Sequence, residues 1–475
     1  MNRYLKELKK SSSRIISLLV LLALIAAGIY ISTRLLKYMG TGIGIGAIAG
    51  VIIIGALVWL CHYKKPMAAL IIELILMMAM IPAIFAVGKL DTTLDKIGNT
   101  KQYEVIQIVA LADSGITAES DFSSYVFGYD SSDDQAYDKG SEILAENDKK
   151  VAVSKPYDNT EKAYAALKDR SCAIMVLTST TRSDLSVIDE EYEDKIKVIF
   201  EKKYPLDEVK VKAVDIEKEP FTIYLCGADL SSGSDITSTG RGDVNILLTI
   251  NPKTEKVYMQ VIPRDTFVYV PAKGGSSKLS YSGWWGGVQS SIDSIEDKFG
   301  VEINYYAKLN FNGLTQLVDA LGGVTVNSYY TYSYKGASFV KGENFVDGET
   351  ALLFARARKM LPENELSRGQ HQMELIKAIF RKYAEDPTFE KGMAVIDELS
   401  NNFVTNIPEE DYYKAFKVIS KVLPELQTME NHSIKGTYEW HYDEVRPTYY
   451  LYYYYPAEGE IERVRDSIEA IKKGE

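Results

Sequence analysis

The chain has 475 residues, which is too long for one ordinary domain. Its formal net charge of −11 argues against a broad nucleic-acid-binding face, because such a face needs many Lys and Arg side chains to neutralise phosphates. Three cysteines exclude a disulfide framework, and we expect Cys172 and Cys226 to be separate buried thiols.

Three apolar runs within residues 1–90 predict a membrane anchor with three transmembrane helices. They lie at 15–31, 42–60 and 67–87, and each has about the length that crosses a bilayer. Basic residues precede the first run and no small-residue cleavage site follows it, which favours an anchor over a removed signal peptide. Because positive residues favour the cytoplasm, we expect the N-terminus inside the cell and the chain after Gly88 outside it.

Residues 100–218 predict a smaller α/β domain outside the membrane. Strand-like segments at 105–111 and 172–177 accompany helical patterns at 137–146 and 160–168. We find no group of catalytic residues in this region. Its role is open between scaffold, partner docking and control of access.

Residues 221–265 contain three short apolar runs that predict buried strands, at 221–226, 244–250 and 257–262. Ionisable residues stand where these runs begin or end. They are Asp229, Arg241, Asp243, Arg264 and Asp265. Ligands of an open sheet collect beyond the strand ends, so these residues are candidates for a site. The alternative is that they are solvated loop charges.

Arginines are few and grouped between residues 221 and 372, whereas lysines are scattered. The five are Arg241, Arg264, Arg356, Arg358 and Arg368. Arginine is suited to planar, bidentate contact with phosphate oxygens. Asp229 and Asp243 suit Mg²⁺, which takes one or two carboxylates together with phosphate oxygens. The pattern therefore predicts a phosphate site.

Several motifs in this order resemble the LytR-CpsA-Psr (LCP) family. They are GAD at 227–229, GRGD at 240–243, IPRDT at 262–266, LVDALGGVTV at 317–326, GETALLFARARK at 348–359 and SRGQHQ at 367–372. The branch it resembles most is the capsule-associated CpsA type, which places membrane spans and an accessory domain ahead of the catalytic one. For residues 219–475 the resemblance implies an α/β catalytic domain with a mixed central sheet flanked by helices.

The resemblance also implies an activity. It is that of a membrane-anchored, Mg²⁺-dependent phosphotransferase, which joins a glycopolymer such as capsular polysaccharide from a polyprenyl-pyrophosphate carrier to cell-wall peptidoglycan. The family domain is known for an apolar cavity between sheet and helices that suits a polyprenyl tail. Capsule-assembly membrane proteins are further candidate partners. A rival interpretation is a non-catalytic regulator that binds the lipid-linked polymer and controls its export or chain length.

Roles for single residues follow from this resemblance. Catalytic residues that hold the pyrophosphate and its metal would be Asp229, Arg241, Asp243, Arg264, Arg356, Arg358 and Arg368. Mg²⁺ would bind to Asp229 and Asp243, and Gln372 would orient a phosphate oxygen. Asp265 is either the general base for the acceptor hydroxyl or an ion-pair partner that orients Arg264.

Spacing gives expectations for the last three arginines. Arg356 and Arg358 would point to one side, about 7 Å apart, on an extended segment. We therefore expect the helix that starts near Gly348 to end before Arg356. Arg368 and Gln372 are four residues apart and should share one face of the following helix.

This chain departs from the family pattern at two places. Glu365 stands where an Asp is usual, which keeps the charge on a longer side chain. Gln370 and His371 stand where many members carry another Arg. His371 replaces that positive charge only when it is protonated.

Aromatic residues mark two further segments. Trp284 and Trp285, amid glycines, either line a mouth for a lipid or sugar or anchor a loop. They precede a predicted helix at 286–299. The Tyr-rich run at 449–455 predicts a strand with aromatics on both faces.

Overall fold

The computed structural model describes residues 2–39, 41–98, 100–189, 191–230, 235–429, 432–447 and 449–475. The chain divides into two compact units. The first comprises Met1–Gly98, Pro387–Ser400 and Ile407–Ser420, and the second comprises Asn99–Asp386, Asn401–Asn406 and Lys421–Glu475. The predicted extracellular domains thus fall in one unit, and two short segments from the C-terminal part group with the predicted anchor.

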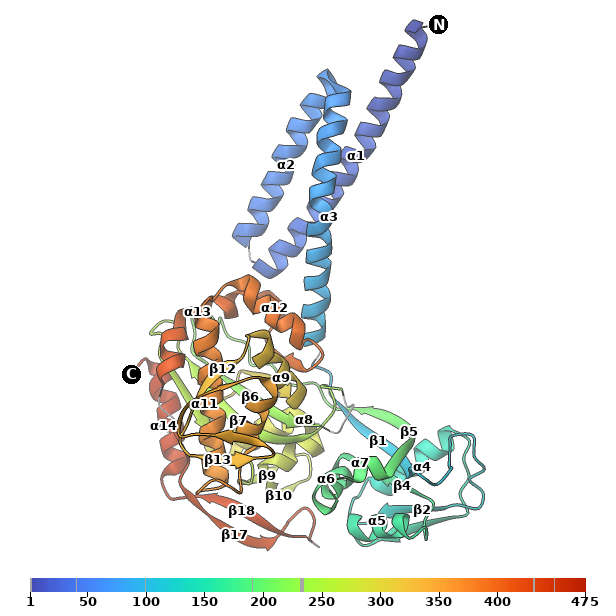
Figure 1. Ribbon diagram of the computed structural model, residues 1–475, viewed down its shortest axis with the longest axis vertical. Coiled ribbons are helices and arrows are strands. Elements are labelled where there is room, and N and C mark those ends of the chain that lie inside the picture. The colour runs from blue at the N-terminus through green and yellow to red at the C-terminus, as the bar shows by residue number, and fades with distance from the viewer. Residues whose placement is uncertain are drawn as a thin grey trace. The chain divides into compact units, whose positions relative to one another are not determined.

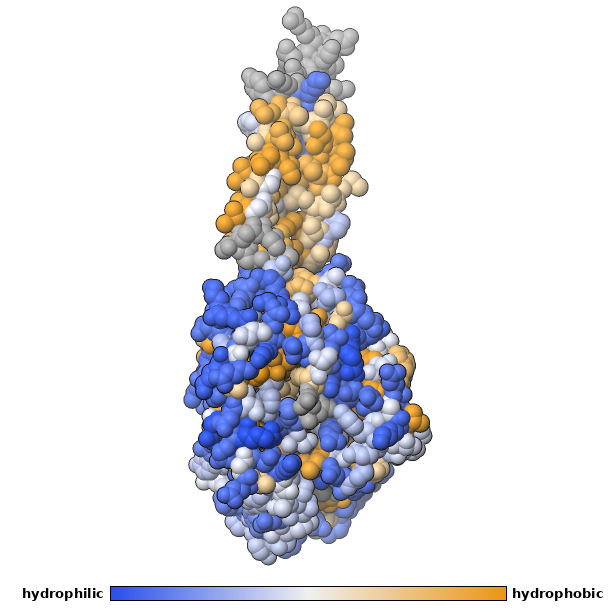
Figure 2. Space-filling model, turned by 90° about the vertical axis from the view of Figure 1, so that its left-hand side faces the viewer, coloured by the Kyte–Doolittle hydropathy of each residue, from blue (hydrophilic) through white to orange (hydrophobic). Residues whose placement is uncertain are grey.

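The first unit is helical. Its long helices are α1 (Asn2–Met39), α2 (Thr41–Lys64) and α3 (Pro66–Ile97). Each contains a stretch long and apolar enough to cross a membrane, and these are Ile15–Tyr38, Gly44–Cys61 and Met67–Ile97. Apolar side chains cover much of their visible surface (Figure 2). The three helices therefore fit a membrane anchor.

Polar contacts join the helices of this unit. The Ser17 hydroxyl of α1 donates a 2.8 Å hydrogen bond to Glu73 of α3, so this carboxylic group faces another helix. Helix α12 (Phe389–Leu399) contributes Asp397, which accepts a bond from Thr93 and forms an ion pair with Lys89. The 3₁₀ helix η1 (Glu409–Asp411) and the start of α13 (Tyr412–Thr428) complete the unit.

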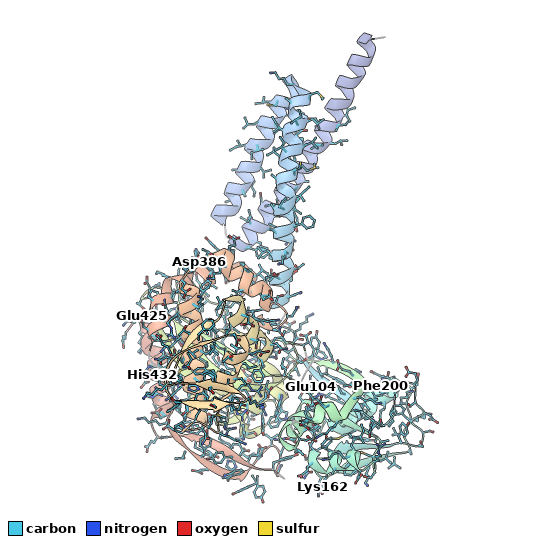
Figure 3. The ribbon with its side chains drawn as sticks, viewed as in Figure 1. Glu104, Lys162, Phe200, Asp386, Glu425 and His432 are labelled. Carbon is cyan, nitrogen blue, oxygen red and sulfur yellow. The ribbon has the colours of Figure 1, made fainter. Side chains whose placement is uncertain are left out.

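The second unit contains two five-stranded sheets, each with its own helices (Figure 1). We call residues 100–218 the N-terminal lobe and the rest of the unit the C-terminal lobe. In Figure 3 Glu104 and Phe200 mark the first lobe, and Glu425 and His432 mark the second.

The N-terminal lobe is an α/β sandwich, in agreement with the sequence pattern. Its sheet has the order β3-β2-β4-β1-β5, in which β2 is parallel to β3 and β4 whereas β1 is antiparallel to β4 and β5. The elements are β1 (Tyr103–Leu111), β2 (Val126–Asp130), α4 (Ala136–Glu146), β3 (Val153–Tyr157), α5 (Thr160–Lys168), β4 (Ile174–Leu177), α6 (Ser179–Ile188), α7 (Tyr192–Lys195) and β5 (Ile196–Pro205).

The C-terminal lobe is built on a mixed sheet, which confirms the predicted fold class. The strand order is β16-β11-β6-β7-β8, and β11 and β6 are parallel whereas the other neighbours are antiparallel. The strands are β6 (Phe221–Asp229), β7 (Arg241–Ile250), β8 (Val257–Val261), β11 (Tyr305–Asn310) and β16 (Phe403–Thr405). Cys226 of β6 and Cys172 of the other lobe are free and buried, as expected.

Helices cover both faces of this sheet. One layer is α8 (Leu279–Phe299) and α14 (Glu460–Lys473), whose Ile292, Ile295, Val464 and Ile468 share a buried cluster with Tyr224 of β6. The other layer is α9 (Phe311–Ala320), α10 (Gly348–Arg356) and α11 (Glu365–Ala384). A Cβ on Gly313 of α9 would lie 2.6 Å from the Leu309 side chain, which shows how closely this layer approaches β11.

The C-terminal lobe also contains four two-stranded ribbons. They pair β9 (Phe267–Val270) with β10 (Gly275–Lys278), β12 (Val324–Ser328) with β15 (Gly342–Val346), β13 (Tyr332–Tyr334) with β14 (Ala337–Phe339), and β17 (Gly436–Tyr442) with β18 (Tyr450–Pro456). The last strand confirms the predicted Tyr-rich strand.

The start of α8 differs from the expectation. The helix begins at Leu279, and its regular geometry is interrupted at Gly286 and Gly287, where Gly287 has φ +64°. This left-handed conformation favours glycine, so the pair that suggested a helix start is a break within the helix. Trp284 and Trp285 accordingly lie on a helix and not in a loop.

The two lobes share buried polar contacts. Trp285 Nε1 donates a 2.6 Å hydrogen bond to Thr180 Oγ1. The Arg446 guanidinium binds both carboxylate oxygens of Asp184, at 2.8 and 3.0 Å, and both residues are buried. These contacts join α6 to α8 and to the segment between β17 and β18.

Candidate functional site

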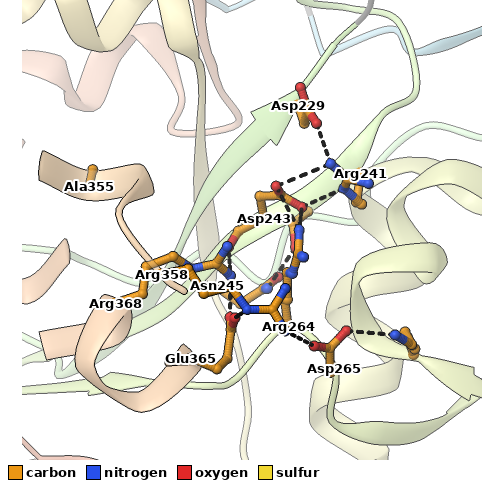
Figure 4. A network of polar contacts seen from close by, with 12 residues as sticks. Asp229, Arg241, Asp243, Asn245, Arg264, Asp265, Ala355, Arg358, Glu365 and Arg368 are labelled. Atoms are coloured by element: carbon orange, nitrogen blue, oxygen red, sulfur yellow. Dashed lines mark hydrogen bonds and ion pairs between the residues drawn. The ribbon is translucent and has the colours of Figure 1, made fainter. Parts of the chain in front are cut away.

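The site lies where β6 ends and β7 begins (Figure 4). Asp229, the last residue of β6, pairs in the sheet with Arg241, the first residue of β7. Asp243 follows two residues later, and residues two apart on a strand share a face. Lys308 of β11 holds the segment before β7. Its buried Nζ donates hydrogen bonds to the carbonyls of Ile236 and Ser238, at 2.8 and 2.7 Å.

Asp243 is the centre of the first half of the site. Arg241 Nε donates to Asp243 Oδ1 at 2.6 Å, and the same guanidinium bonds to Asp229. Arg264 Nη1 lies 2.9 Å from both oxygens of Asp243. Arginines from β7 and from the loop after β8 thus meet on one carboxylate. The sequence predicted that they lie together, but not that they pair with Asp243.

Glu365 is the centre of the second half. It forms ion pairs with Arg368 and with Arg358, whose Nε lies 3.1 Å from Glu365 Oε2. Arg368 also reaches the backbone oxygen of Asp243 at 3.5 Å, which joins the two halves. The Glu that replaces the usual Asp therefore holds two of the predicted arginines.

Asp265 acts as an ion-pair partner, although not of the expected arginine. This buried carboxylate accepts a 2.9 Å bond from Lys278 and lies 3.7 Å from Arg358 Nη2. Burial alone would raise the pKa of Asp265, but Lys278, Arg264 and Arg358 together lower it. A carboxylate held in this way is a poor proton acceptor near neutral pH, which argues against Asp265 as the general base.

Arg356 and Arg358 do not act as the expected adjacent pair. Helix α10 continues to Arg356, because the Ala357 N–H still bonds to the Leu353 carbonyl, so the prediction that it ends before this residue was wrong. The exposed Arg356 guanidinium lies 4.5 Å from the centre of the Phe311 ring. Arg358, beyond the helix end, instead turns toward Glu365.

Gln372 lies beside the site on α11 and is buried. Its Nε2 is 3.5 Å from the carbonyl of Ala355 in the last turn of α10. It thus shares the α11 face of Arg368, as predicted, and it links α11 to α10. The phosphate contact expected of Gln372 stays a prediction.

His371 does not supply the missing positive charge. Its fully buried ring stacks on Phe354 at 4.2 Å and on Tyr332 at 5.5 Å between centroids. Burial lowers the pKa of His371 to about 4, so the ring is neutral at physiological pH. It is part of an aromatic core between α10 and α11.

The two proposed metal ligands have opposite pKa shifts. Burial would raise the pKa of Asp243, but Arg241, Arg264 and Arg368 lower it well below its usual range. Burial and the nearby charge of Asp243 raise the pKa of Asp229. Within the described residues no three His, Cys, Asp or Glu side chains gather as a metal site. Two carboxylates therefore fit Mg²⁺ only if further oxygen ligands come from elsewhere, such as a phosphate.

Sequence reasoning missed one residue of the site, Lys278, and left the role of Trp284 open. Lys278, at the end of β10, carried no motif that separates it from a surface lysine. Trp284 lies beneath Arg241, whose guanidinium carbon is 5.6 Å from the ring centre, and it stacks on Tyr281 at 5.2 Å. This contact places Trp284 at the site. Trp285 instead bonds to Thr180 of the N-terminal lobe and so holds the two lobes together.

These features define a class of protein, an α/β domain with a cluster of arginines and carboxylates at its strand ends, in a chain with apolar N-terminal helices. The LytR_cpsA_psr family model matches residues 191–469, and the chain belongs to this family. The match begins within the N-terminal lobe and includes every predicted site residue.

The chain is similar to curated relatives and to solved structures. A Bacillus licheniformis protein called polyisoprenyl-teichoic acid–peptidoglycan teichoic acid transferase TagU is 35% identical over 239 residues, which cover 49% of this chain and 76% of the relative. The Bacillus subtilis protein of the same name is 34% identical over 221 residues, with 46% and 70% covered. The crystal structure of B. subtilis TagU is 30% identical and covers 54% of this chain and 97% of that chain, with a TM-score of 0.42.

Proposed function

We propose that the protein is a membrane-anchored phosphotransferase that moves a glycopolymer from a polyprenyl-diphosphate carrier to peptidoglycan. The observation that carries the proposal is the convergence of four arginines from separate parts of the chain on the carboxylates of Asp243 and Glu365. The arginines are Arg241, Arg264, Arg358 and Arg368. The names of the relatives describe the same kind of transfer.

The charge of the site supports a diphosphate ligand. Its basic side chains are Arg241, Arg264, Lys278, Arg356, Arg358 and Arg368, and its carboxylates are Asp229, Asp243, Asp265 and Glu365. Six positive and four negative groups leave two positive charges in excess. An anion that occupies the site would complete the balance, and guanidinium groups suit the oxygens of linked phosphates.

The sheet face beside the site supports a lipid-linked donor. Leu225, Val244 and Leu309 lie on the central strands β6, β7 and β11, yet each is only half-buried. Sheet register places them around Gly227, two residues before Asp229. Central strands of a sheet covered on both faces are normally fully buried, so exposed apolar surface here suits a polyprenyl chain.

In the reaction, an acceptor hydroxyl oxygen forms a bond to the phosphorus that carries the glycan. The bond from this phosphorus to the bridging oxygen breaks, the polyprenyl phosphate leaves with the electron pair, and the hydroxyl proton passes to this phosphate or to water. The guanidinium groups hold the non-bridging oxygens and stabilise the charge that develops on them. The fixed ion pairs with Asp243 and Glu365 keep these groups in place before the substrate arrives.

Mg²⁺ is part of the proposal. Asp229 and Asp243 would hold it, with phosphate oxygens completing its coordination, and the ion would neutralise negative charge on the diphosphate. Burial, together with the charge of Asp243, raises the pKa of Asp229, and a bound cation would favour its ionised form.

The test uses the full chain in detergent with a lipid-linked oligosaccharide, peptidoglycan oligomers and Mg²⁺. We expect a covalent glycan–peptidoglycan product and free polyprenyl monophosphate. Arg264→Ala should abolish both products while the melting temperature stays close to that of the unchanged chain. Arg381→Ala is the matched control, because Arg381 pairs with Glu374 on α11, away from the site.

Two outcomes would contradict the proposal. Full activity of Arg264→Ala would remove the arginine cluster from the mechanism. Tight binding of the lipid-linked substrate without any covalent product would favour the rival role as a regulator of polymer export or length.

A further inference from the structure

The ribbon of β17 and β18 has two different faces. Its cross-strand pairs Tyr438–Tyr454, Trp440–Tyr452 and Tyr442–Tyr450 are in register. Residues directly opposite each other in an antiparallel pair point to the same side, so six aromatic side chains share one face. The other face packs on Phe267 of β9 through His441, Tyr453 and Tyr455.

Five of these side chains form a surface that we call the aromatic ladder: Tyr438, Trp440, Tyr442, Tyr450 and Tyr452. Tyr438 and Tyr452 stack at 4.4 Å with nearly parallel rings. Trp440 lies 5.1 Å from Tyr452 and 5.8 Å from Tyr450. Trp440, Tyr442 and Tyr450 are 57%, 63% and 54% exposed, so the ladder ends as an open aromatic surface. An exposed patch of this kind marks a binding surface.

The ladder begins beside the arginine cluster. The backbone N–H of Tyr454, at the buried end of the ribbon face, donates a 2.8 Å bond to the carbonyl of Asp265. Tyr438 pairs with Tyr454, and burial together with the charges of Glu365 and Asp265 raises the pKa of Tyr438. The exposed rings therefore lead away from the site, over about 13 Å between Tyr438 and Tyr442 at the usual rise of a strand.

The chemistry of the ladder suits an uncharged sugar chain. The strands Gly436–Tyr442 and Tyr450–Pro456 contain no Lys or Arg and one acidic residue, Glu439. A polyanionic chain would gain no ion pair from these strands. The face of an aromatic ring carries partial negative charge, which attracts the polarised C–H groups of a sugar ring, and tyrosine hydroxyls are available to the sugar hydroxyls.

Of the two substrates, the acceptor has the greater need of this surface. The donor of the proposed reaction is held by its diphosphate and its polyprenyl tail. An acceptor glycan has neither, so its affinity has to come from contacts with the sugar rings themselves.

We propose that the aromatic ladder binds the glycan strand of the acceptor, a chain of N-acetylhexosamine rings, and leads it to the arginine cluster. The choice of the acceptor rests on the proposed function, whereas the binding of sugar rings by these residues does not.

The test measures binding of chitohexaose, an uncharged N-acetylglucosamine oligomer, to the full chain in detergent by calorimetry. We expect Trp440→Ala to weaken binding about tenfold or more, a loss of roughly 1.4 kcal/mol, and Trp440→Phe to restore most of it. Tyr137→Ala is the matched control, because Tyr137 is an exposed tyrosine of the N-terminal lobe, 45% accessible. Melting temperatures of all variants establish that they fold.

Arg264→Ala separates this inference from the proposed function, since it should lose transfer and keep chitohexaose binding. Equal affinity of Trp440→Ala and the unchanged chain would overturn the inference, as would no binding of chitohexaose at all. It would also be overturned if Trp440→Ala changed only self-association or binding to lipid vesicles. Stronger competition by an anionic teichoic-acid fragment than by chitohexaose would assign the ladder to the donor and overturn the choice of the acceptor.

Discussion

At the scale of single residues, the site depends on carboxylates as much as on arginines. Asp243 and Glu365 each hold two guanidinium groups, and Arg368 connects both centres. A buried carboxylate in such a cluster offsets the repulsion between neighbouring guanidinium groups and fixes their direction. The excess positive charge is then available to a ligand.

His371 gives a pH-dependent prediction for stability. Its pKa is about 4 in the folded chain against an ordinary value of 6.5. Between these values the unfolded chain binds a proton that the folded chain does not, so this residue makes stability fall as pH is lowered from 6.5 to 4. The effect is on the order of 3 kcal/mol at most. We expect His371→Phe, which keeps a ring in the aromatic core, to melt at a less pH-dependent temperature in detergent.

The quantity to compare is the change in melting temperature between pH 6.5 and 4, in the unchanged chain and in His371→Phe. Other acidic groups titrate in both proteins and cancel. If the unchanged chain and His371→Phe lost stability in parallel between pH 6.5 and 4, His371 would not be a buried neutral ring.

At the scale of elements, the sequence predicted the helices and strands whose apolar residues recur with a clear periodicity. The predicted helices and strands appear near their expected places, except that α8 begins at Leu279. Four of the five grouped arginines meet at one site, whereas Arg356 lies over the Phe311 ring. The apolar pattern could not show that α10 includes Arg356, because one more residue at the end of a helix leaves the spacing of its apolar residues unchanged. It also missed Lys278, which acquires its role from the ribbon that brings it to Asp265.

The contact between the lobes is the element-scale feature with the largest expected effect on stability. Arg446 is buried, and its Nη1 donates to both carboxylate oxygens of Asp184. Its guanidinium also lies against the rings of Tyr281, Trp285 and Tyr449. Removal of one partner from a buried ion pair leaves an uncompensated charge. We therefore expect Asp184→Ala to destabilise the second unit by about 3–5 kcal/mol in urea unfolding.

Asp158→Ala is the matched control in the same lobe. Its ion pair with Lys162 is largely exposed, with 74% and 59% of the two side chains accessible, and such pairs contribute about 1 kcal/mol or less. Equal effects of the two substitutions would show that the Asp184–Arg446 pair does not join the lobes.

At the scale of the whole molecule, the chain combines three apolar helices in the first unit with the two α/β lobes of the second unit. The three apolar stretches were predicted from composition alone, and the helices that contain them extend beyond the apolar residues at their ends. The predicted direction of the chain, with the N-terminus inside and both lobes outside, rests on the positive-inside rule and stays a prediction.

Natural cysteines offer a test of this topology. Cys61, at the inner end of the second predicted span, is exposed, whereas Cys172 and Cys226 are buried. A membrane-impermeant maleimide should leave Cys61 unlabelled on intact cells and label it after permeabilisation. The variant Tyr137→Cys should be labelled on intact cells. The reverse pattern would place the two lobes in the cytoplasm and contradict the proposed acceptor.

The central claim is that the arginines form one site for two linked phosphates. The most direct measurement is calorimetric binding of a short-chain polyprenyl diphosphate and of its monophosphate to the full chain in detergent with Mg²⁺. We expect the diphosphate to bind about tenfold or more tightly, and Arg358→Lys to lose most of this preference because lysine lacks the planar pair of donors. Arg381→Lys should keep it. Equal affinity for the two lipids, or a preference that survives Arg358→Lys and Arg264→Lys, would contradict the account.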